Sequence, residues 1–543
     1  MTIGRVVEVV GVVLALMAWP ALCFAQTPND AAAAQAHLGK VDFPTSCSEQ
    51  ARPTLDPQVQ PMLERGVALL HSFQYQQARQ TFDEAASRAP DCAMAHWGQA
   101  MSLYEQLWDL PDKKKLSEGY QEIKEAQKLR PPTPKEQAFI AAAAAYYQKN
   151  SKISYTDRAK AYSLALEEMH TQMPDDVEVG SFYALSLVAL AEHDVESLEN
   201  QKKAIAILRP LFEQYPDHPG VAHYLIHAAD RPELAPEGLE AARRYAAIAP
   251  DSPHALHMPS HIFVRLGLWQ DSIASNIASE ASAARLAQEH KVESNYQTHA
   301  RDFRNYSYLQ SGQEARARDV IGHMDHVVGA DKETKEEHRT FLEARTAIEL
   351  HRWKEAAALQ DPPLRKDQQD STRWARAIGA ARTGDLAGAE SAVNALKESV
   401  AERESWARKE GYVVSKEKPS DLGEAEAWLA FAKGQTEDAL KEMRQAAEHQ
   451  EENGGEGVGI PAREMLADML MELKRPSEAL VEYRVVLKSA PNRFDGLLGA
   501  ARAAQASGDA SGAQRFYAKL TEVCAPGADR PELAEAKTFV ARK

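Results

Sequence analysis

The sequence predicts an all-α fold in which helix–turn–helix units stack into a right-handed solenoid. A turn residue is followed five positions later by Ala and then by two further apolar residues, as in Gly434, Ala439, Met443 and Ala446. The last three are four and three positions apart, which places them on one face of a helix. Aromatic residues make up only 7% of the chain. This composition disfavours an all-β fold and agrees with stacked helices.

The pattern recurs along the chain, which is the mark of a repeat protein. Pro216 and Pro250 are 34 residues apart, and so are Ala479 and Ala513. Elsewhere the spacing between corresponding positions stretches to 41–50 residues, which predicts lengthened helices or inserted loops. Further units begin at Phe73, Gly312, Gly384, Gly434, Lys474 and Gly508.

A 34-residue unit of this kind resembles the tetratricopeptide repeat (TPR). Gly66, Ala78, Phe82, Ala85 and Pro90 match its pattern best, and the resemblance extends from about residue 61 to residue 520. It implies a superhelix with a concave groove that binds a protein, a peptide or a small ligand.

The first 25 residues predict a secretory signal peptide. Arg5 precedes an apolar run from Val9 to Leu22, and Ala25 provides a small residue for cleavage. The alternative is an uncleaved anchor helix, but this run is shorter than the ~20 apolar residues that a membrane span needs. We therefore expect a periplasmic or secreted protein with no membrane span after cleavage.

The remaining chain divides at polar segments into two predicted arrays. An extended segment, 26–58, precedes an N-terminal TPR array, 59–328, which is followed by a C-terminal TPR array, 329–525, and a tail, 526–543. Whether the arrays form one superhelix is left open by the sequence. The chain has 63 Lys and Arg against 79 Asp and Glu, a net charge of −16, which argues against nucleic acid as a partner.

Three cysteines follow the signal peptide: Cys47, Cys92 and Cys524. In an oxidising compartment, Cys47 and Cys92 are candidates for a disulfide because both lie in the N-terminal part of the chain. The alternative is three unpaired, buried thiols. Neither of the two has a second cysteine nearby in the sequence, so a cysteine-type zinc site is not indicated.

Histidines are concentrated in the second half of the N-terminal array. The TPR resemblance implies that positions 2, 5 and 9 of the first helix in each unit face the groove, and three consecutive units carry polar residues there. Spacings of three and four residues keep such side chains on one helical face. The residues predicted to form this patch, with their neighbours, are His223, His227, Asp230, His254, His257, His261, Arg265, His299, Asp302 and Tyr306.

One interpretation of the patch is a metal site with His223, His227, His257 and His261 as ligands. Neutral imidazole is a common ligand of transition metals such as zinc. Asp302 would then orient a ligand or act as a fifth one.

The alternatives are a metal-free groove, in which Arg265 suits a carboxylate, or histidines with a structural role. A metal-dependent hydrolase would use Asp230 or Asp302 as base, but no recognised catalytic motif is present. We therefore expect a binding scaffold rather than an enzyme.

Three short segments resemble those of a group of exported bacterial TPR proteins. They are His71-Ser-Phe, residues 92–98 and residues 254–261. This resemblance implies export and no particular reaction. His71, Cys92 and His96 are candidates for a second metal set, although the repeat frame favours burial for His96 and the proposed disulfide competes for Cys92.

Overall fold

The computed structural model describes residues 37–107, 112–148, 153–191, 197–290, 295–410, 417–455 and 457–541. Every regular element in these ranges is a helix, so the all-α prediction is confirmed. The expected signal peptide lies outside the described residues, and residues 37–58 precede the first described helix without regular structure. Among the helices of these ranges, none has the length and apolar character needed to cross a membrane.

Helices that follow one another in the chain pack side by side, as stacked helical hairpins do. The helices up to residue 326 are α2 (Val59–His71), α3 (Tyr75–Arg88), α4 (Ala93–Met101), α5 (Lys113–Leu129), α6 (Pro134–Tyr146), α7 (Tyr155–Gln172), α8 (Val177–Ala191), α9 (Ser197–Gln214), α10 (Pro219–Ala228), α11 (Ala235–Ile248), α12 (Pro253–His257), α13 (Pro259–Arg265), α14 (Trp269–His290), α15 (Asn295–Gln310), α16 (Glu314–Gly322) and the 3₁₀ turn η1 (Met324–His326).

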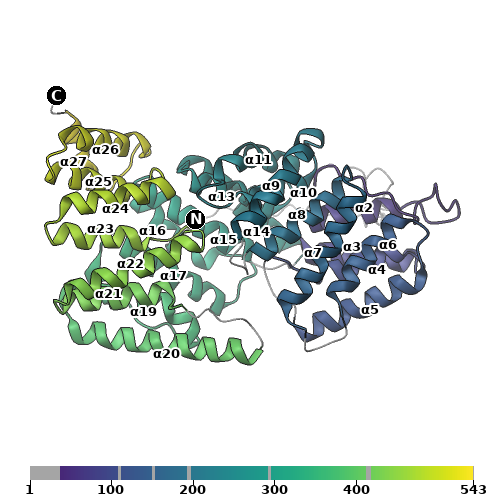
Figure 1. Cartoon of the computed structure of the whole chain (residues 1–543), viewed down its shortest axis with the longest axis horizontal. Coiled ribbons are helices and arrows are strands. Elements are labelled where there is room, and N and C mark those ends of the chain that lie inside the picture. Colours follow the sequence, from purple (N-terminus) through teal and green to yellow (C-terminus); the bar gives the residue numbers. More distant parts are fainter. Residues whose placement is uncertain are drawn as a thin grey trace, which may run out of the picture.

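The stacking continues through the second half of the chain. Its helices are α17 (Lys332–Glu349), α18 (Trp353–Ala357), η2 (Lys366–Gln369), α19 (Asp370–Thr383), α20 (Leu386–Glu410), α21 (Ser420–Ala432), α22 (Thr436–Glu452), α23 (Ala462–Glu472), α24 (Pro476–Ser489), α25 (Phe494–Ala506), α26 (Ala510–Val523) and α27 (Leu533–Ala541). The elements are arranged along the long axis from α2–α8 at the right, through α9–α14, to α17–α27 at the left (Figure 1).

The predicted turn residues share one backbone conformation. Phe73 and Lys474 have φ of 54° and 59°, and the predicted turn glycines have φ between 76° and 86°. This left-handed conformation costs glycine little and other residues more, which explains why glycine predominates. The glycines are Gly312, Gly384, Gly434 and Gly508.

The apolar repeat positions form the contacts between the helices. Ala78, Phe82 and Ala85 are completely buried. The Phe82 ring lies so close to the backbone of Gly66 that a Cβ there would be 2.5 Å from it, and a Cβ at Gly98 would be nearer still. Small residues at these positions therefore let neighbouring helices pack against Phe82.

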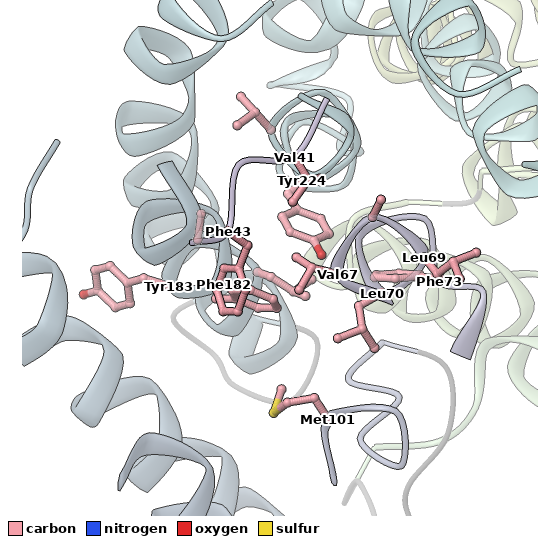
Figure 2. Packing of buried hydrophobic residues seen from close by; sticks show 14 of the residues in the cluster. Val41, Phe43, Val67, Leu69, Leu70, Phe73, Met101, Phe182, Tyr183 and Tyr224 are labelled. Carbon is pink, nitrogen blue, oxygen red and sulfur yellow. The ribbon is translucent and has the colours of Figure 1, made fainter. Parts of the chain in front are cut away.

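The segment before α2 is part of the N-terminal core. Val41 and Phe43 belong to the same buried cluster as residues of α2, α8 and α10, and Figure 2 shows Phe43 beside Phe182 of α8. The Phe43 ring stacks on Trp97 with 5.5 Å between centroids. Cys47 and Cys92 form a disulfide with a Cα–Cα distance of 5.7 Å, which ties the segment to the start of α4.

Buried contacts continue across the predicted array boundary at 328/329. One hydrophobic cluster contains Tyr308 and Leu309 on one side and Leu342 and Leu350 on the other. Residues 526–543, expected to be a tail, include α27. The segment before α27 returns to the turn after α15, where the Asp529 amide donates to the Gly312 carbonyl at 2.8 Å.

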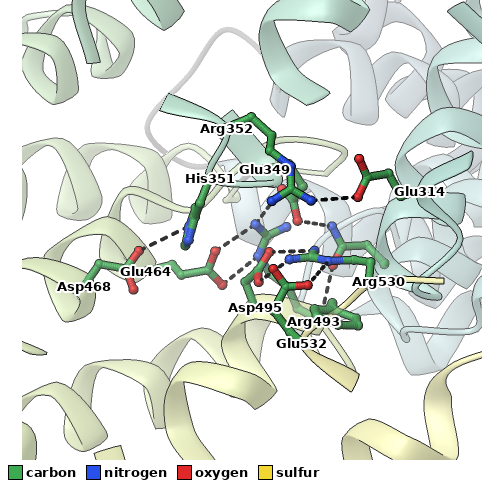
Figure 3. Close-up of polar contacts among 12 residues, drawn as sticks. Glu314, Glu349, His351, Arg352, Glu464, Asp468, Arg493, Asp495, Arg530 and Glu532 are labelled. Carbon is green, nitrogen blue, oxygen red and sulfur yellow. Dashed lines mark hydrogen bonds and ion pairs between the residues drawn. The ribbon is translucent and has the colours of Figure 1, made fainter. Parts of the chain in front are cut away.

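A buried arginine connects the middle of the chain to its C-terminal helices. Arg493 forms ion pairs of 2.8 Å with Glu349 and with Glu464, and it donates to the Tyr306 hydroxyl at 3.0 Å. Figure 3 shows Arg493 between the two carboxylates and the neighbouring pair of Asp495 and Arg530. Because Arg493 is fully buried, these partners are required to compensate its charge.

Candidate metal centre

Six histidines on α10, α12, α13 and α15 form two groups of three. Within each group, one imidazole nitrogen from every residue lies within 4.8 Å of the other two. We call His257, His261 and His299 triad A, and His223, His227 and His254 triad B. The histidine patch predicted from the repeat frame is thus two adjacent clusters.

This arrangement divides the four ligands expected from the sequence. His257 and His261 belong to triad A, whereas His223 and His227 belong to triad B. The expected helix is interrupted once, because α12 ends at His257 and α13 begins at Pro259, which has no amide proton to donate. Met258 between them keeps a helical conformation, with φ of −53° and ψ of −34°, so His257 and His261 remain on one face as expected from their spacing.

The clusters are more enclosed than a groove surface. His223, His254 and His257 are at most 3% exposed, while His261 is partly exposed and His299 is exposed. A ligand approaching from solvent would reach the last two residues but not the first three. The expectation that all six line an open groove is therefore wrong for the buried three.

The hydrogen bonds of triad A determine where its protons lie. His257 Nδ1 is 2.7 Å from Oδ1 of Asn276, whose amide group donates to the Ser272 carbonyl. His261 Nδ1 is 2.7 Å from a carboxylate oxygen of Asp230. Because both neighbours are acceptors, both Nδ1 atoms donate, and each neutral ring has its lone pair on Nε2.

These two lone pairs face each other. His257 Nε2 and His261 Nε2 are 3.0 Å apart. Two acceptors at this distance need a cation between them: either a proton, which makes one ring an imidazolium, or a metal ion. His299 supplies a third imidazole nitrogen at the same place, which is the composition of a metal site.

Asp230 holds His261 and is itself held by Arg265. Arg265 Nε donates to the second carboxylate oxygen of Asp230 at 2.9 Å. Burial would raise the pKa of Asp230, but Arg265 and His261 outweigh it and keep this pKa well below its usual value. Arg265 also donates to the Gly454 carbonyl at 3.0 Å. It therefore connects triad A to the loop after α22 and is not a free cation for a ligand carboxylate.

Triad B has a similar construction. His223 Nδ1 donates to the His71 carbonyl at 2.6 Å, so its Nε2 lone pair faces His254 Nε2 at 2.9 Å. Nε2 of His227 is buried and has no hydrogen-bonding partner among the described residues. A buried imidazole nitrogen without a partner is costly, which makes it a candidate ligand atom.

A phenylalanine ring packs against each triad. The Phe303 ring lies 4.6–5.1 Å, centroid to centroid, from the rings of His257, His261 and His299. The Phe73 ring lies 4.4–5.5 Å from the three rings of triad B. These apolar walls limit the access of water to the imidazoles.

Burial favours the neutral form of four of the six imidazoles. Burial lowers the pKa values of His223, His254 and His257 well below the usual range. It also lowers the pKa of His227 to about 3. Neutral imidazole is the form that binds metals, so the rings are available as ligands at neutral pH.

Two predicted residues lie outside the triads. Asp302 forms an ion pair with Arg345, and Tyr306 accepts a hydrogen bond from Arg493. Both lie on α15 with His299, but their side chains contact the C-terminal half of the chain. The assignment of Tyr306 to the histidine patch is therefore wrong, and Asp302 is engaged elsewhere.

A third buried group was not predicted from the sequence. Glu178 lies between His71 Nε2, at 2.7 Å, and His218 Nε2, at 3.0 Å. Nδ1 of His71 is hydrogen-bonded to the Tyr224 hydroxyl, and Nδ1 of His218 accepts a hydrogen bond from the Val221 amide. All four imidazole nitrogens thus have protein partners. This network orients the backbone of His71, whose carbonyl holds His223.

The predicted set of His71, Cys92 and His96 does not form. Cys92 is in the disulfide, and His96 Nδ1 is 2.9 Å from Glu122.

The sequence pattern does not single out Asn276, Phe303 or Glu178 as residues of the site. Their roles depend on how distant helices pack, and the repeat frame does not place those helices relative to one another.

Comparisons with known proteins give structural similarity without sequence similarity. No family model matches the chain, and no curated protein matches it. The solved structures similar to it include yeast Tom70, with 12% identity and a TM-score of 0.34, covering 89% of this chain and 95% of that chain. Naa15/Naa10 bound to HypK-THB has 10% identity and a TM-score of 0.24, covering 91% and 92%. A human IFIT1 dimer with m7Gppp-AAAA has 13% identity and a TM-score of 0.35, covering 80% and 90%.

Similarity at these TM-scores carries no argument about this chain. The architecture follows from the chain itself: sequential helices pack side by side, and the repeat residues occupy the contacts between them. The chain is an all-α helical solenoid whose repeat pattern resembles the TPR.

Proposed function

We propose that this protein binds a transition metal ion, such as zinc, through His257, His261 and His299. The observation that carries the proposal is the pair of facing Nε2 atoms, 3.0 Å apart, in two rings whose Nδ1 atoms already donate elsewhere. Two nitrogens bound to one tetrahedral zinc at ~2.0–2.1 Å are about 3.3 Å apart. The separation in triad A is close to this value.

The surroundings of triad A support the same conclusion. A carboxylate that accepts the second N–H of a ligating histidine fixes the tautomer and orientation of the ring. Asp230 makes this contact with His261, and Asn276 makes the corresponding contact with His257. The metal therefore finds rings that are already oriented.

The proposal is for binding and not for hydrolysis. A metal with three nitrogen ligands keeps an open position, where it can polarise a bound ligand or water. A hydrolase also needs a base. Asp230 is engaged by His261 and Arg265, and Asp302 by Arg345, so neither of the carboxylates considered from the sequence is available.

The repeat fold supports a broader binding role. Stacked helical repeats present extended concave surfaces, which such proteins use to bind partners. We therefore include a protein or peptide partner on this surface, reached through the exposed side of triad A, in the proposal.

Export is also part of the proposal. It rests on the N-terminal sequence pattern and is supported by the Cys47–Cys92 disulfide, since disulfides persist in oxidising compartments. N-terminal sequencing of the protein from cell fractions tests it. We expect a mature start near residue 26 outside the cytoplasm, and an intact cytoplasmic chain would contradict export.

Metal analysis of the untagged protein tests the metal site. After loading with Zn²⁺ and desalting, the full chain is expected to retain zinc, and H257A/H261A is expected to lose it. The control H323A/H326A removes two exposed histidines whose rings are 5.0 Å apart and should leave binding unchanged.

Two results would overturn the proposal. One is less than half an equivalent of zinc in the wild-type chain. The other is wild-type retention by an H257A/H261A variant whose circular dichroism shows that it is folded.

A further inference from the structure

Triad B lies directly beside triad A. The rings of His254 and His257 are 6.3 Å apart, and those of His227 and His261 are 6.4 Å apart, centroid to centroid. The two groups therefore form one continuous array of six imidazoles. Triad B plays no part in the site proposed above.

Three features of triad B are those of a ligand set. Hydrogen bonding to the His71 carbonyl places the lone pair of His223 on Nε2, facing His254. His227 presents a buried Nε2 without a partner among the described residues. One nitrogen of each residue lies within 4.8 Å of the other two, a spacing that a single ion can bridge.

The backbone next to triad B is strained. Phe73 is a bulky residue with φ of 54°, a conformation that is rare for such residues. Its carbonyl accepts from the Tyr296 hydroxyl at 2.9 Å, and its ring packs against all three histidines. The turn after α2 thus holds an apolar wall against these imidazoles, as Phe303 does for triad A.

The donor set indicates the kind of metal. All six donors are imidazoles, and the nearby carboxylate of Asp230 is occupied by His261 and Arg265. Imidazole nitrogen suits copper, zinc, iron and nickel, and among the divalent ions copper binds such sites most tightly. Hard cations such as Mg²⁺ and Ca²⁺ prefer oxygen ligands and are disfavoured here.

We infer that His223, His227 and His254 form a second metal site beside triad A, so that the solenoid holds a pair of neighbouring copper ions, each with three imidazole ligands. This inference rests on the proposed function for the first ion. It assigns to the turn of Phe73 and to the His71 carbonyl the role of positioning the second set of ligands.

Copper stoichiometry tests the inference. The full chain is loaded with excess Cu²⁺, desalted and analysed for bound copper. We expect two equivalents in the wild type, one in H227A/H254A, one in H257A/H261A and two in the control H323A/H326A. One equivalent in the wild type, retained by H227A/H254A and lost by H257A/H261A, would overturn the second site while leaving the first.

No retained copper in the wild-type chain would overturn both sites. Two equivalents that persist in H227A/H254A would place the second ion elsewhere and overturn the inference.

Electron paramagnetic resonance tests whether the two ions are neighbours. Two Cu²⁺ ions in adjacent triads are expected to couple, so the doubly loaded wild type should show less signal than two isolated spins. H227A/H254A should show the full signal of one isolated ion. Two full, uncoupled signals in the wild type would overturn the adjacency of the sites.

Discussion

The Nε2 atoms of His257 and His261 face each other at 3.0 Å, while Asn276 and Asp230 each accept the Nδ1 proton of one ring. The two rings are held in place by groups that do not themselves approach the space between them. A metal ion entering that space gains ligands whose tautomers and orientations are already set. This preorganisation leads to the first of five predictions.

Asp230→Asn is expected to weaken zinc binding by about 10–100-fold, because loss of a carboxylate behind a ligating histidine typically has this effect. A competition titration against a chromogenic chelator measures it. Asp319→Asn is the matched control, since Asp319 is an exposed carboxylate 3.1 Å from the exposed His323. An unchanged affinity in folded Asp230→Asn would show that Asp230 does not act on the metal.

Arg493→Met is expected to lower the free energy of unfolding by about 3–5 kcal/mol, because it leaves the buried carboxylates of Glu349 and Glu464 without their cation. Urea denaturation measures the change. Arg502→Met removes an arginine from an exposed pair with Glu535 and should cost less than about 1 kcal/mol. Equal effects of the two substitutions would contradict a special role for Arg493.

Gly98→Ala is expected to cost about 1–3 kcal/mol, because the added Cβ would overlap the Phe82 ring. Phe82→Leu in the same chain should recover part of this loss, so that the two changes are not additive. Gly322→Ala serves as the control, because a Cβ there meets nothing within 4 Å. Urea denaturation of the wild type, the two single variants and the double variant gives a double-mutant cycle. Additive losses of unfolding free energy in this cycle would argue against the contact.

Reduction of the Cys47–Cys92 disulfide is expected to lower stability by about 2–4 kcal/mol, since the bond closes a loop between residues 45 positions apart. Urea unfolding with and without dithiothreitol measures this. The reductant should shift the wild-type transition and leave that of C47S/C92S unchanged. A wild-type midpoint that does not respond to the reductant would count against the bond.

Cys524 is expected to react slowly with iodoacetamide in the folded protein, because burial raises the pKa of its thiol to about 12. The thiolate is the reactive form, and raising the pKa from 9.0 to about 12 reduces its fraction at pH 8 roughly a thousandfold. Peptide mass spectrometry should show a labelling rate that rises with pH beyond pH 9 in the folded chain. The same rate at pH 8 in folded and urea-unfolded protein would contradict the burial of this thiol.

The repeat architecture could be predicted from sequence because its determinants are local. The spacing of Ala78, Phe82 and Ala85 follows from 3.6 residues per helical turn, and all three are buried contacts. The turn at Lys474 was recognised from its position in the pattern, although glycine is usual there. Its φ of 59° shows that position in the repeat sets this conformation.

The histidine site was predicted less completely. The repeat frame brought the six histidines to one region, since neighbouring first helices stack side by side. It did not predict their division into two triads, which depends on the rotation of each ring. Those rotations are set by distant acceptors, such as the His71 carbonyl, 152 residues from His223.

The sequence by itself determined the helical repeat, the small residues at its crossings and the region where histidines gather, because these depend on short-range spacing. Only the tertiary structure decided which nitrogens face each other, and that Tyr306 joins Arg493, 187 residues away, rather than the histidines. Proton positions and ion pairs depend on atoms a few ångströms apart in space. In a solenoid those atoms come from helices far apart in the chain, and their sequence separation does not tell which side chains meet.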